Sequence, residues 1–96
     1  MSDLIAILKD QRETGRKMAA DVPKMLADPA ITPGQVDTLF RALEEQAGFV
    51  EKLTQVLESG GYDPDTLKAA ERLEELYVDL AGQVAEKVRE LRGGSA

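Results

Sequence analysis

The chain of 96 residues has no cysteine and no histidine. Without cysteine there can be no disulfide bond and no thiol nucleophile. Without histidine there is no imidazole base, no histidine-ligated metal and no Ser-His-Asp triad. Tryptophan is also missing, and aromatic residues make up only 4% of the chain. The sequence also has no phosphate-binding glycine loop, nucleophile elbow or kinase motif. We therefore expect a protein that is not an enzyme and that carries no catalytic residues, metal or cofactor.

Long apolar runs are scarce as well. The apolar stretch near the start, Leu4 to Leu8, spans five residues and follows the acidic Asp3. A secretory signal needs a basic start and a longer apolar stretch, and a membrane-spanning helix needs about 20 apolar residues. We therefore expect a cytoplasmic protein that does not bind membranes.

Positive charge is outnumbered by negative charge. The chain has 12 Lys and Arg against 18 Asp and Glu, a net charge of −6, which disfavours direct binding to nucleic acid or to anionic lipid. Residues 1–28 contain five basic and five acidic side chains, whereas residues 29–96 contain seven basic and thirteen acidic ones. The whole excess of negative charge therefore lies after residue 28.

The patterns that are present are helical. Apolar residues make up 43% of the chain, and no alternating strand pattern occurs. The clearest helix is predicted at 33–59, where Thr32 and Gln35 form a capping-box pattern around Pro33 and where Gly60-Gly61 marks the end.

Two further helices flank this one. Asp63-Pro64 predicts the start of a third helix that continues to about residue 92, followed by a flexible tail at 93–96. The first helix is predicted at about 3–27. Pro23 leaves two possibilities: a kink in one helix, or a separate short helix capped by Asp21. Residues 1–92 would form a single helical domain.

The width of each apolar face predicts how the helices pack. The helix at 33–59 has a seam that repeats every seven residues and an apolar flank of Ala42, Phe49 and Val56. The helix at 64–92 also has a wide apolar face, whereas the helix at 3–27 has a narrower stripe. We predict an all-α, up-down-up three-helix bundle, in which a long antiparallel hairpin of the second and third helices carries the first helix. The alternative is an open hairpin that self-associates through the same apolar faces.

Polar and small residues interrupt the first helix's apolar stripe at Gln11 and Gly15. Gly15 faces inward, where it could let another helix approach closely. From the rise of about 1.5 Å per residue, Gln11 and Gln46 should lie at the same height. We expect these two amides to form a polar layer in the core that sets the register of the helices. The alternatives are that both amides point to water, or that the gap receives a helix of a partner.

The acidic residues follow the outer faces of the second and third helices. The candidate docking residues are Asp37, Glu44, Glu51 and Glu58, which repeat every seven residues, and Glu71, Glu75, Asp79 and Glu86. Like charges four residues apart destabilise a helix by a few tenths of a kcal/mol. We interpret this surface as a docking site for another protein with a basic surface, although an acidic face can also serve solubility alone.

Three functions remain compatible with these features. The first is a protein–protein interaction module, such as an adaptor, an assembly factor or a small chaperone. The second is an acidic inhibitor or nucleic-acid mimic that occupies a basic site, and its binding would weaken steeply with salt. The third is a homo-oligomeric helical scaffold, whose mass would depend on concentration.

Overall fold

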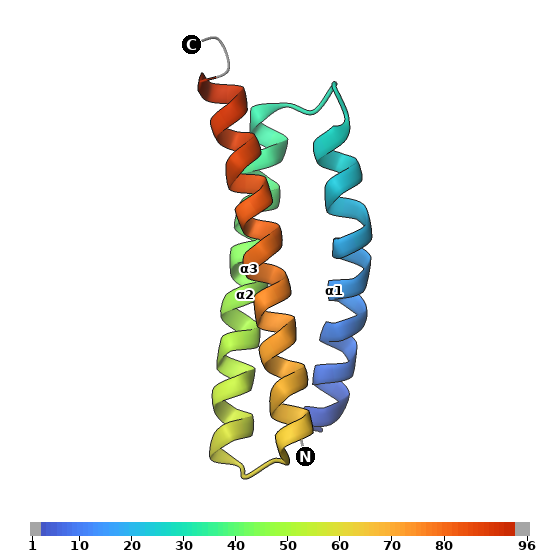
Figure 1. Ribbon diagram of the computed structural model, residues 1–96, viewed down its shortest axis with the longest axis vertical. Helices are drawn as coiled ribbons and strands as arrows, with labels where there is room; N and C mark the ends of the chain where they lie inside the picture. Colours follow the sequence, from blue (N-terminus) through green and yellow to red (C-terminus); the bar gives the residue numbers. More distant parts are fainter. Residues whose placement is uncertain (1–2, 94–96) are drawn as a thin grey trace.

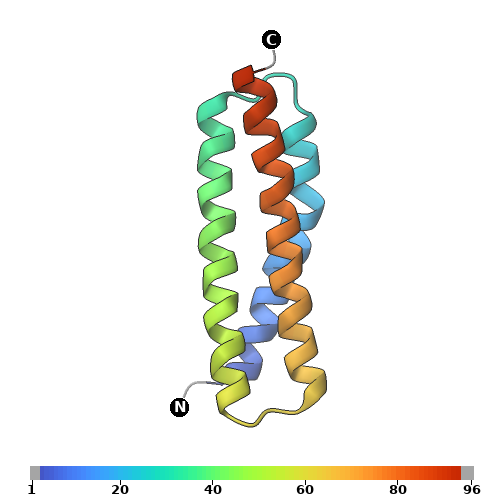
Figure 2. The same ribbon diagram turned by 60° about the vertical axis from the view of Figure 1, so that its left-hand side comes forward.

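The computed structural model describes residues 3–93, which form three long helices (Figure 1). These are α1 (Leu4–Ala27), α2 (Pro33–Ser59) and α3 (Pro64–Gly93). The helices alternate in direction and form a rod of about 51 × 21 × 20 Å (Figure 2). The predicted up-down-up bundle is confirmed: α2 and α3 pack together most extensively, and α1 docks mainly against α3.

The boundaries of α1 and α3 differ in detail from the predicted ones. Asp3 caps α1 from outside, because its carboxylate accepts hydrogen bonds from the backbone N–H groups of Ile5 and Ala6 at 3.1 and 3.2 Å. The helix continues through Pro23, so Asp21 does not cap a separate helix. At the other end Gly93 belongs to α3 and not to the expected tail, and the tail residues 94–96 lie outside the described residues.

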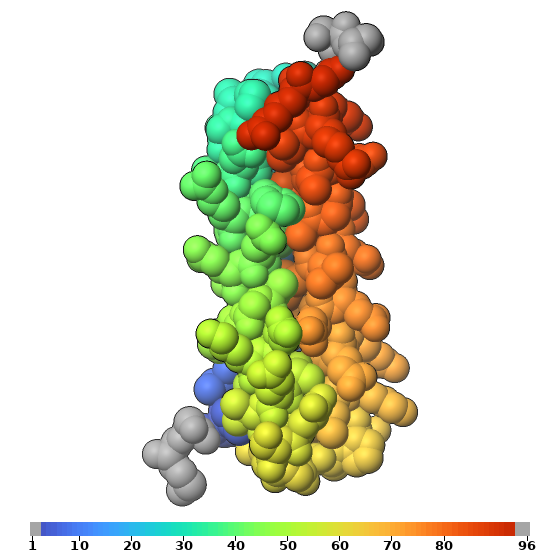
Figure 3. Space-filling view, turned by 90° about the vertical axis from the view of Figure 1, so that its left-hand side faces the viewer, coloured from blue at the N-terminus to red at the C-terminus, as the bar shows by residue number. Residues whose placement is uncertain are grey.

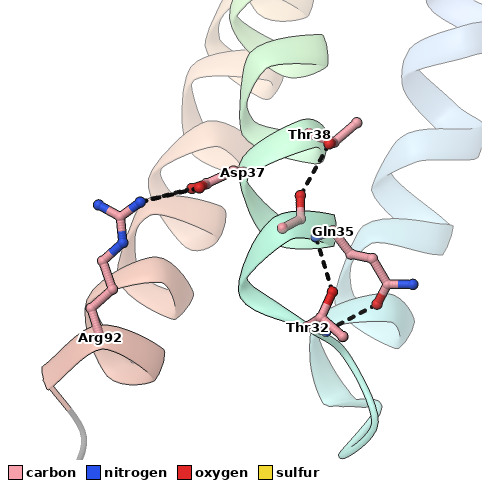
Figure 4. Close-up of polar contacts among 6 residues, drawn as sticks. Thr32, Gln35, Asp37, Thr38 and Arg92 are labelled. Carbon is pink, nitrogen blue, oxygen red and sulfur yellow. Dashed lines mark hydrogen bonds and ion pairs between the residues drawn. The ribbon is translucent and has the colours of Figure 1, made fainter.

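The start of α2 has the predicted capping box (Figure 4). The backbone N–H of Gln35 donates to Thr32 Oγ1 at 3.2 Å, and Gln35 Oε1 accepts from the Thr32 N–H at 2.9 Å. Two otherwise unpaired backbone donors at the helix end are thus satisfied. This end of α2 is therefore fixed by its own sequence.

A tight turn joins α2 to α3. Gly61 has φ +70°, a left-handed conformation that glycine adopts without steric cost. Asp63 then caps α3, where its Oδ1 accepts from the Thr66 N–H at 2.8 Å. This hydrogen bond from the Thr66 backbone lowers the pKa of Asp63 below its ordinary value. The turn places α2 and α3 side by side and antiparallel.

The centre of the bundle is the seam of α2. Four residues spaced seven apart are completely buried, namely Val36, Leu43, Val50 and Leu57. The inward residues of α3 pack with them in one core, and they are Ala70, Leu73, Tyr77, Leu80 and Val84. From α1 only Leu8 and Val22 are buried apolar side chains of this core. The narrow stripe of α1 therefore covers only one side of the hairpin.

At Gly15 the helix α1 lies close against α3. A Cβ atom at this position would lie 2.8 Å from Leu73 Cδ1 and 3.2 Å from Leu76 Cδ2. The buried Tyr77 hydroxyl reaches across and donates to the Gln11 carbonyl oxygen at 3.4 Å, a long hydrogen bond. Burial raises the pKa of Tyr77. The inward position predicted for Gly15 is therefore confirmed.

Gln11 and Gln46 do not form the expected hydrogen-bonded layer. Both are half-buried, and within residues 3–93 neither buried Oε1 atom accepts a hydrogen bond. A hydrogen bond between the two amides would require one of these oxygens as acceptor. Each amide oxygen is therefore buried separately and without a protein donor.

The register of the helices explains this difference. Arg12 and Arg16 of α1 share a hollow with residues 69–76 of α3, so Gln11 lies level with about residue 71. Ala47 and Gly48 of α2 share a groove with Val78, so Gln46 lies level with about residue 79. At about 1.5 Å per residue, the two glutamines lie about 12 Å apart along the bundle.

Replacing Gln11 by leucine should stabilise the protein. A buried acceptor without a partner costs about 1–3 kcal/mol, and leucine of similar volume removes this cost. We expect the urea midpoint of Gln11→Leu to rise without a change in slope. The matched control is Gln55→Leu at an exposed position of α2, which should shift stability by at most about 0.5 kcal/mol. A lower midpoint for Gln11→Leu would mean that its amide is satisfied in solution.

Candidate functional site

A shallow groove runs between α2 and α3 on the face that α1 does not cover (Figure 3). It has a volume of about 340 Å³, and it is lined by Glu44, Ala47, Gly48, Glu51, Glu74, Val78 and Ala81. Its lining combines small or apolar side chains with carboxylates from both helices. An adjoining hollow of about 470 Å³ shares Glu74 and Val78 and adds Glu71, Glu75 and Asp79. We call these ten residues together the acidic groove.

Helical spacing explains how the groove is built. Glu44 and Glu51 are seven residues apart on α2, so they lie on the same flank. On α3, Glu74, Val78 and Ala81 are separated by four and three residues and share one flank in the same way. The antiparallel hairpin brings these two flanks together. The site therefore belongs to the hairpin alone, without any contribution from α1.

Gly48 lies in the floor of the groove and has no side chain to fill it. A Cβ atom added there would have no neighbour within 4 Å, so packing inside the bundle does not require glycine. Glycine in a helix destabilises it by about 1 kcal/mol relative to alanine. Gly48 therefore lowers stability and leaves the backbone of α2 accessible from the groove.

The electrostatics of the groove centre on Glu74. Partial burial raises its pKa, and the negative charges of Glu51, Glu71, Glu58 and Glu75 raise it further, in that order. The carboxylates of α2 and α3 therefore act on one another across the groove. The ion pairs among residues 3–93 join Arg16 to Glu13, Lys87 to Glu90, Arg89 to Glu86 and Arg92 to Asp37. None of these neutralises an acid of the groove.

Most of the predicted docking residues gather here. Glu44, Glu51, Glu71, Glu75 and Asp79 line the acidic groove, and Glu58 lies close enough to raise the pKa of Glu74. The residues predicted from the spacing along each helix thus come together on one surface, which α2 and α3 form jointly.

Two predicted docking residues lie elsewhere. Asp37 is paired with Arg92 at 3.1 Å and ties the start of α2 to the end of α3 (Figure 4). Glu86 pairs with Arg89 at 3.0 Å and lines a hollow between α1 and α3, together with Leu26. We therefore exclude Asp37 and Glu86 from the docking surface, because a basic side chain of the same molecule already partners each.

Sequence analysis missed part of the groove. Glu74 was not among the predicted docking residues, although partial burial and the charges of neighbouring acids raise its pKa. The apolar Val78 was not predicted either, and it is 59% exposed. A usable signal was present, because Glu74 and Ala81 lie seven residues apart and flank the core position of Tyr77. Whether Glu74 and Ala81 lie beside α2 depends on the rotation of α2 and α3 about their own axes.

Two other hollows have different chemistry. The hollow between α1 and α3 is lined by three arginines, Arg12, Arg16 and Arg72. The hollow between the end of α1 and the start of α2 measures about 680 Å³ and is mainly apolar, with Met25, Ile31, Leu39 and Ala42 among its lining residues. These two hollows are therefore basic and apolar, in contrast to the acidic groove.

Residues 3–93 contain no group of three or more acidic side chains placed to hold a metal ion. In the same part of the chain no helix is both long enough and apolar enough to cross a membrane. Comparison with known protein families, characterised proteins and solved structures found no match. The function is therefore inferred from the surface itself.

Replacing Glu74 by glutamine should change how stability depends on pH. The pKa of Glu74 in the folded protein lies above its unfolded value, so the folded state binds more protons between these two values. Stability is therefore lost as pH rises through this range. Glu74→Gln should be more stable than the parent at neutral pH, by a few tenths of a kcal/mol for this solvent-screened group.

The difference should vanish as the pH falls below the unfolded pKa, because the parent carboxyl is then protonated in both states. Urea unfolding over a series of pH values measures this convergence. Asp21→Asn on α1 controls for the loss of one negative charge outside the groove, because Asp21 is exposed and takes part in no ion pair within residues 3–93. A constant difference at every pH would contradict a raised pKa of Glu74.

Proposed function

We propose that the protein is a non-enzymatic protein–protein interaction module whose acidic groove binds a basic helical segment of a partner. The observation that supports this most directly is the meeting of unneutralised carboxylates from two helices over a floor of small residues. Adaptors, assembly factors and small chaperones act through such surfaces. No nucleic acid and no membrane is proposed as a direct partner.

The shape of the groove suits a helix. Two antiparallel helices present a groove in which a further helix can lie, as in a four-helix bundle. Ala47, Gly48 and Ala81 keep this groove shallow and allow a close approach. A partner helix would place small or apolar residues on Val78 and the floor. Lysine or arginine on its two flanks would pair with Glu51 on one wall and with the acids of α3 on the other.

The apolar floor also separates this function from its main alternative. An acidic inhibitor or nucleic-acid mimic would bind a basic site through charge alone, and exposed ion pairs weaken as salt screens them. Burial of Val78 and the small-residue floor is insensitive to screening. A helix in the groove should therefore retain part of its affinity at moderate salt, whereas a mimic should lose nearly all of it.

The experiment uses a synthetic amphipathic helix as its probe, with alanine and leucine on one stripe and lysine on both flanks. Binding is followed by fluorescence anisotropy of the labelled peptide at low and moderate salt. Glu51→Lys should weaken binding about tenfold, because it places a cation against the flank of the peptide. Asp21→Lys on α1 introduces the same charge change outside the groove and should have much less effect.

Filling the floor gives the decisive comparison. Gly48→Leu meets no neighbour inside the bundle and improves helix propensity, so it should not unfold the protein. It should nevertheless weaken peptide binding about tenfold, because the peptide can no longer approach α2 closely. Unchanged binding by Gly48→Leu, combined with complete loss at moderate salt, would favour the charge-only mimic instead.

A further inference from the structure

A second surface lies on a different flank of α2. Gln35, Ala42, Phe49 and Val56 repeat every seven residues and therefore follow one line along the helix. Phe49 is 46% exposed and Val56 is 50% exposed, although both belong to the apolar flank that the sequence marks for packing. We call Ala42, Phe49 and Val56 the α2 stripe.

The α2 stripe continues into the apolar hollow near the start of α2. Ala42 lines this hollow together with Ile31 and Met25, and Met25 is itself 44% exposed. Because α1 docks mainly on α3, it leaves this side of α2 uncovered. The apolar surface is thus extended and not confined to one side chain, which is typical of interaction sites.

We propose that a second copy of this chain covers the stripe, with the two α2 helices packed antiparallel about a two-fold axis at Phe49. Ala42 and Val56 are each seven residues from Phe49, on opposite sides of it. In this arrangement the two Phe49 rings meet at the axis. At either end, Ala42 of one copy lies opposite Val56 of the other, so that a small side chain faces a larger one.

The charges beside the stripe select the antiparallel orientation. Glu45 lies four residues before Phe49 and Lys52 lies three residues after it, so both are on the same side of the stripe. An antiparallel pair places Glu45 of each copy beside Lys52 of the other, which gives two opposite-charge pairs. A parallel pair in register has its two-fold axis along the helices, so the Glu45 and Lys52 side chains of the two copies would lie on opposite sides of the interface and would form no such pairs.

Both side chains are available for this pairing. Glu45 and Lys52 are exposed, and neither takes part in an ion pair within residues 3–93. The interface is self-complementary and closes on two copies, because each surface uses the same residues. It leaves the acidic groove open, since Glu44 and Glu51 lie on another flank of α2. The inference therefore does not depend on the proposed function.

The first test is the mass of the intact protein by sedimentation equilibrium over a hundredfold range of concentration. We expect a reversible approach to the mass of two chains. Phe49→Glu should raise the dimer dissociation constant about thirtyfold or more, because it places two carboxylates at the axis. Val78→Glu is the matched control, since it replaces another exposed apolar residue, on α3, and should leave the dimer unchanged.

Circular dichroism serves to check that both variants remain helical. A mass of one chain at every concentration would overturn the proposal. A dimer that Phe49→Glu does not weaken would also overturn it, because the copies would then meet through another surface.

The absence of cysteine permits a second test, of orientation. Phe49→Cys should form a disulfide-linked dimer on mild oxidation, because the axis brings the two copies of this position together. Ala42→Cys and Val56→Cys should cross-link efficiently only when the two variants are mixed. Within the dimer the two copies of residue 42 are separated by fourteen residues, about 21 Å, which exceeds the reach of a disulfide. Efficient cross-linking of Ala42→Cys alone would overturn the antiparallel arrangement.

Charge reversal completes the design. Glu45→Lys and Lys52→Glu should each weaken the dimer, because each brings like charges together across the interface. The double variant restores the two opposite-charge pairs and should recover most of the lost affinity. Failure of the double variant to recover any affinity would contradict the predicted pairing.

Discussion

The burial of one seam on α2 is the constraint on which the rest of the structure depends. Val36, Leu43, Val50 and Leu57 have no exposed surface, and they can be covered only by placing α1 and α3 on the same side of α2. The remaining flanks of α2 are then free of packing requirements. Both proposed interaction surfaces include these flanks, with Gly48 in one and Phe49 in the other. The helix α2 thus contributes to the core and to both candidate interfaces.

The charges of the acidic groove lie on one of these free flanks of α2. Partial burial raises the pKa of Glu74, and the repulsion among the carboxylates that the acidic groove brings together raises it further. Gly48 adds a second cost, because the helix would be more stable with alanine there. A surface selected for stability alone would interleave lysine and fill the floor. Residues that lower stability at one place on the surface are typical of sites maintained for binding.

The sequence was sufficient where local rules decide. The capping box of Thr32 and Gln35, the glycine turn and the seven-residue repeat define α2, and the same helical patterns lead to the up-down-up order. Prediction from the sequence failed where segments that are distant along the chain meet. The expected pairing of Gln11 with Gln46 required the relative heights of two helices, and these depend on where Gly15 lets α1 settle on α3. The pairing of Asp37 with Arg92, which lies 55 residues away, has no local signal at all.

The odd number of helices has a mechanical consequence. The first and last described residues, Asp3 and Gly93, lie at opposite ends of a rod about 51 Å long (Figure 1). Tension applied at these two ends would pull α1 and α3 past each other along their length. Contacts along the interface, including the approach at Gly15, would then resist together instead of opening one after another. Under such tension the bundle would respond in shear, as a stiff rod.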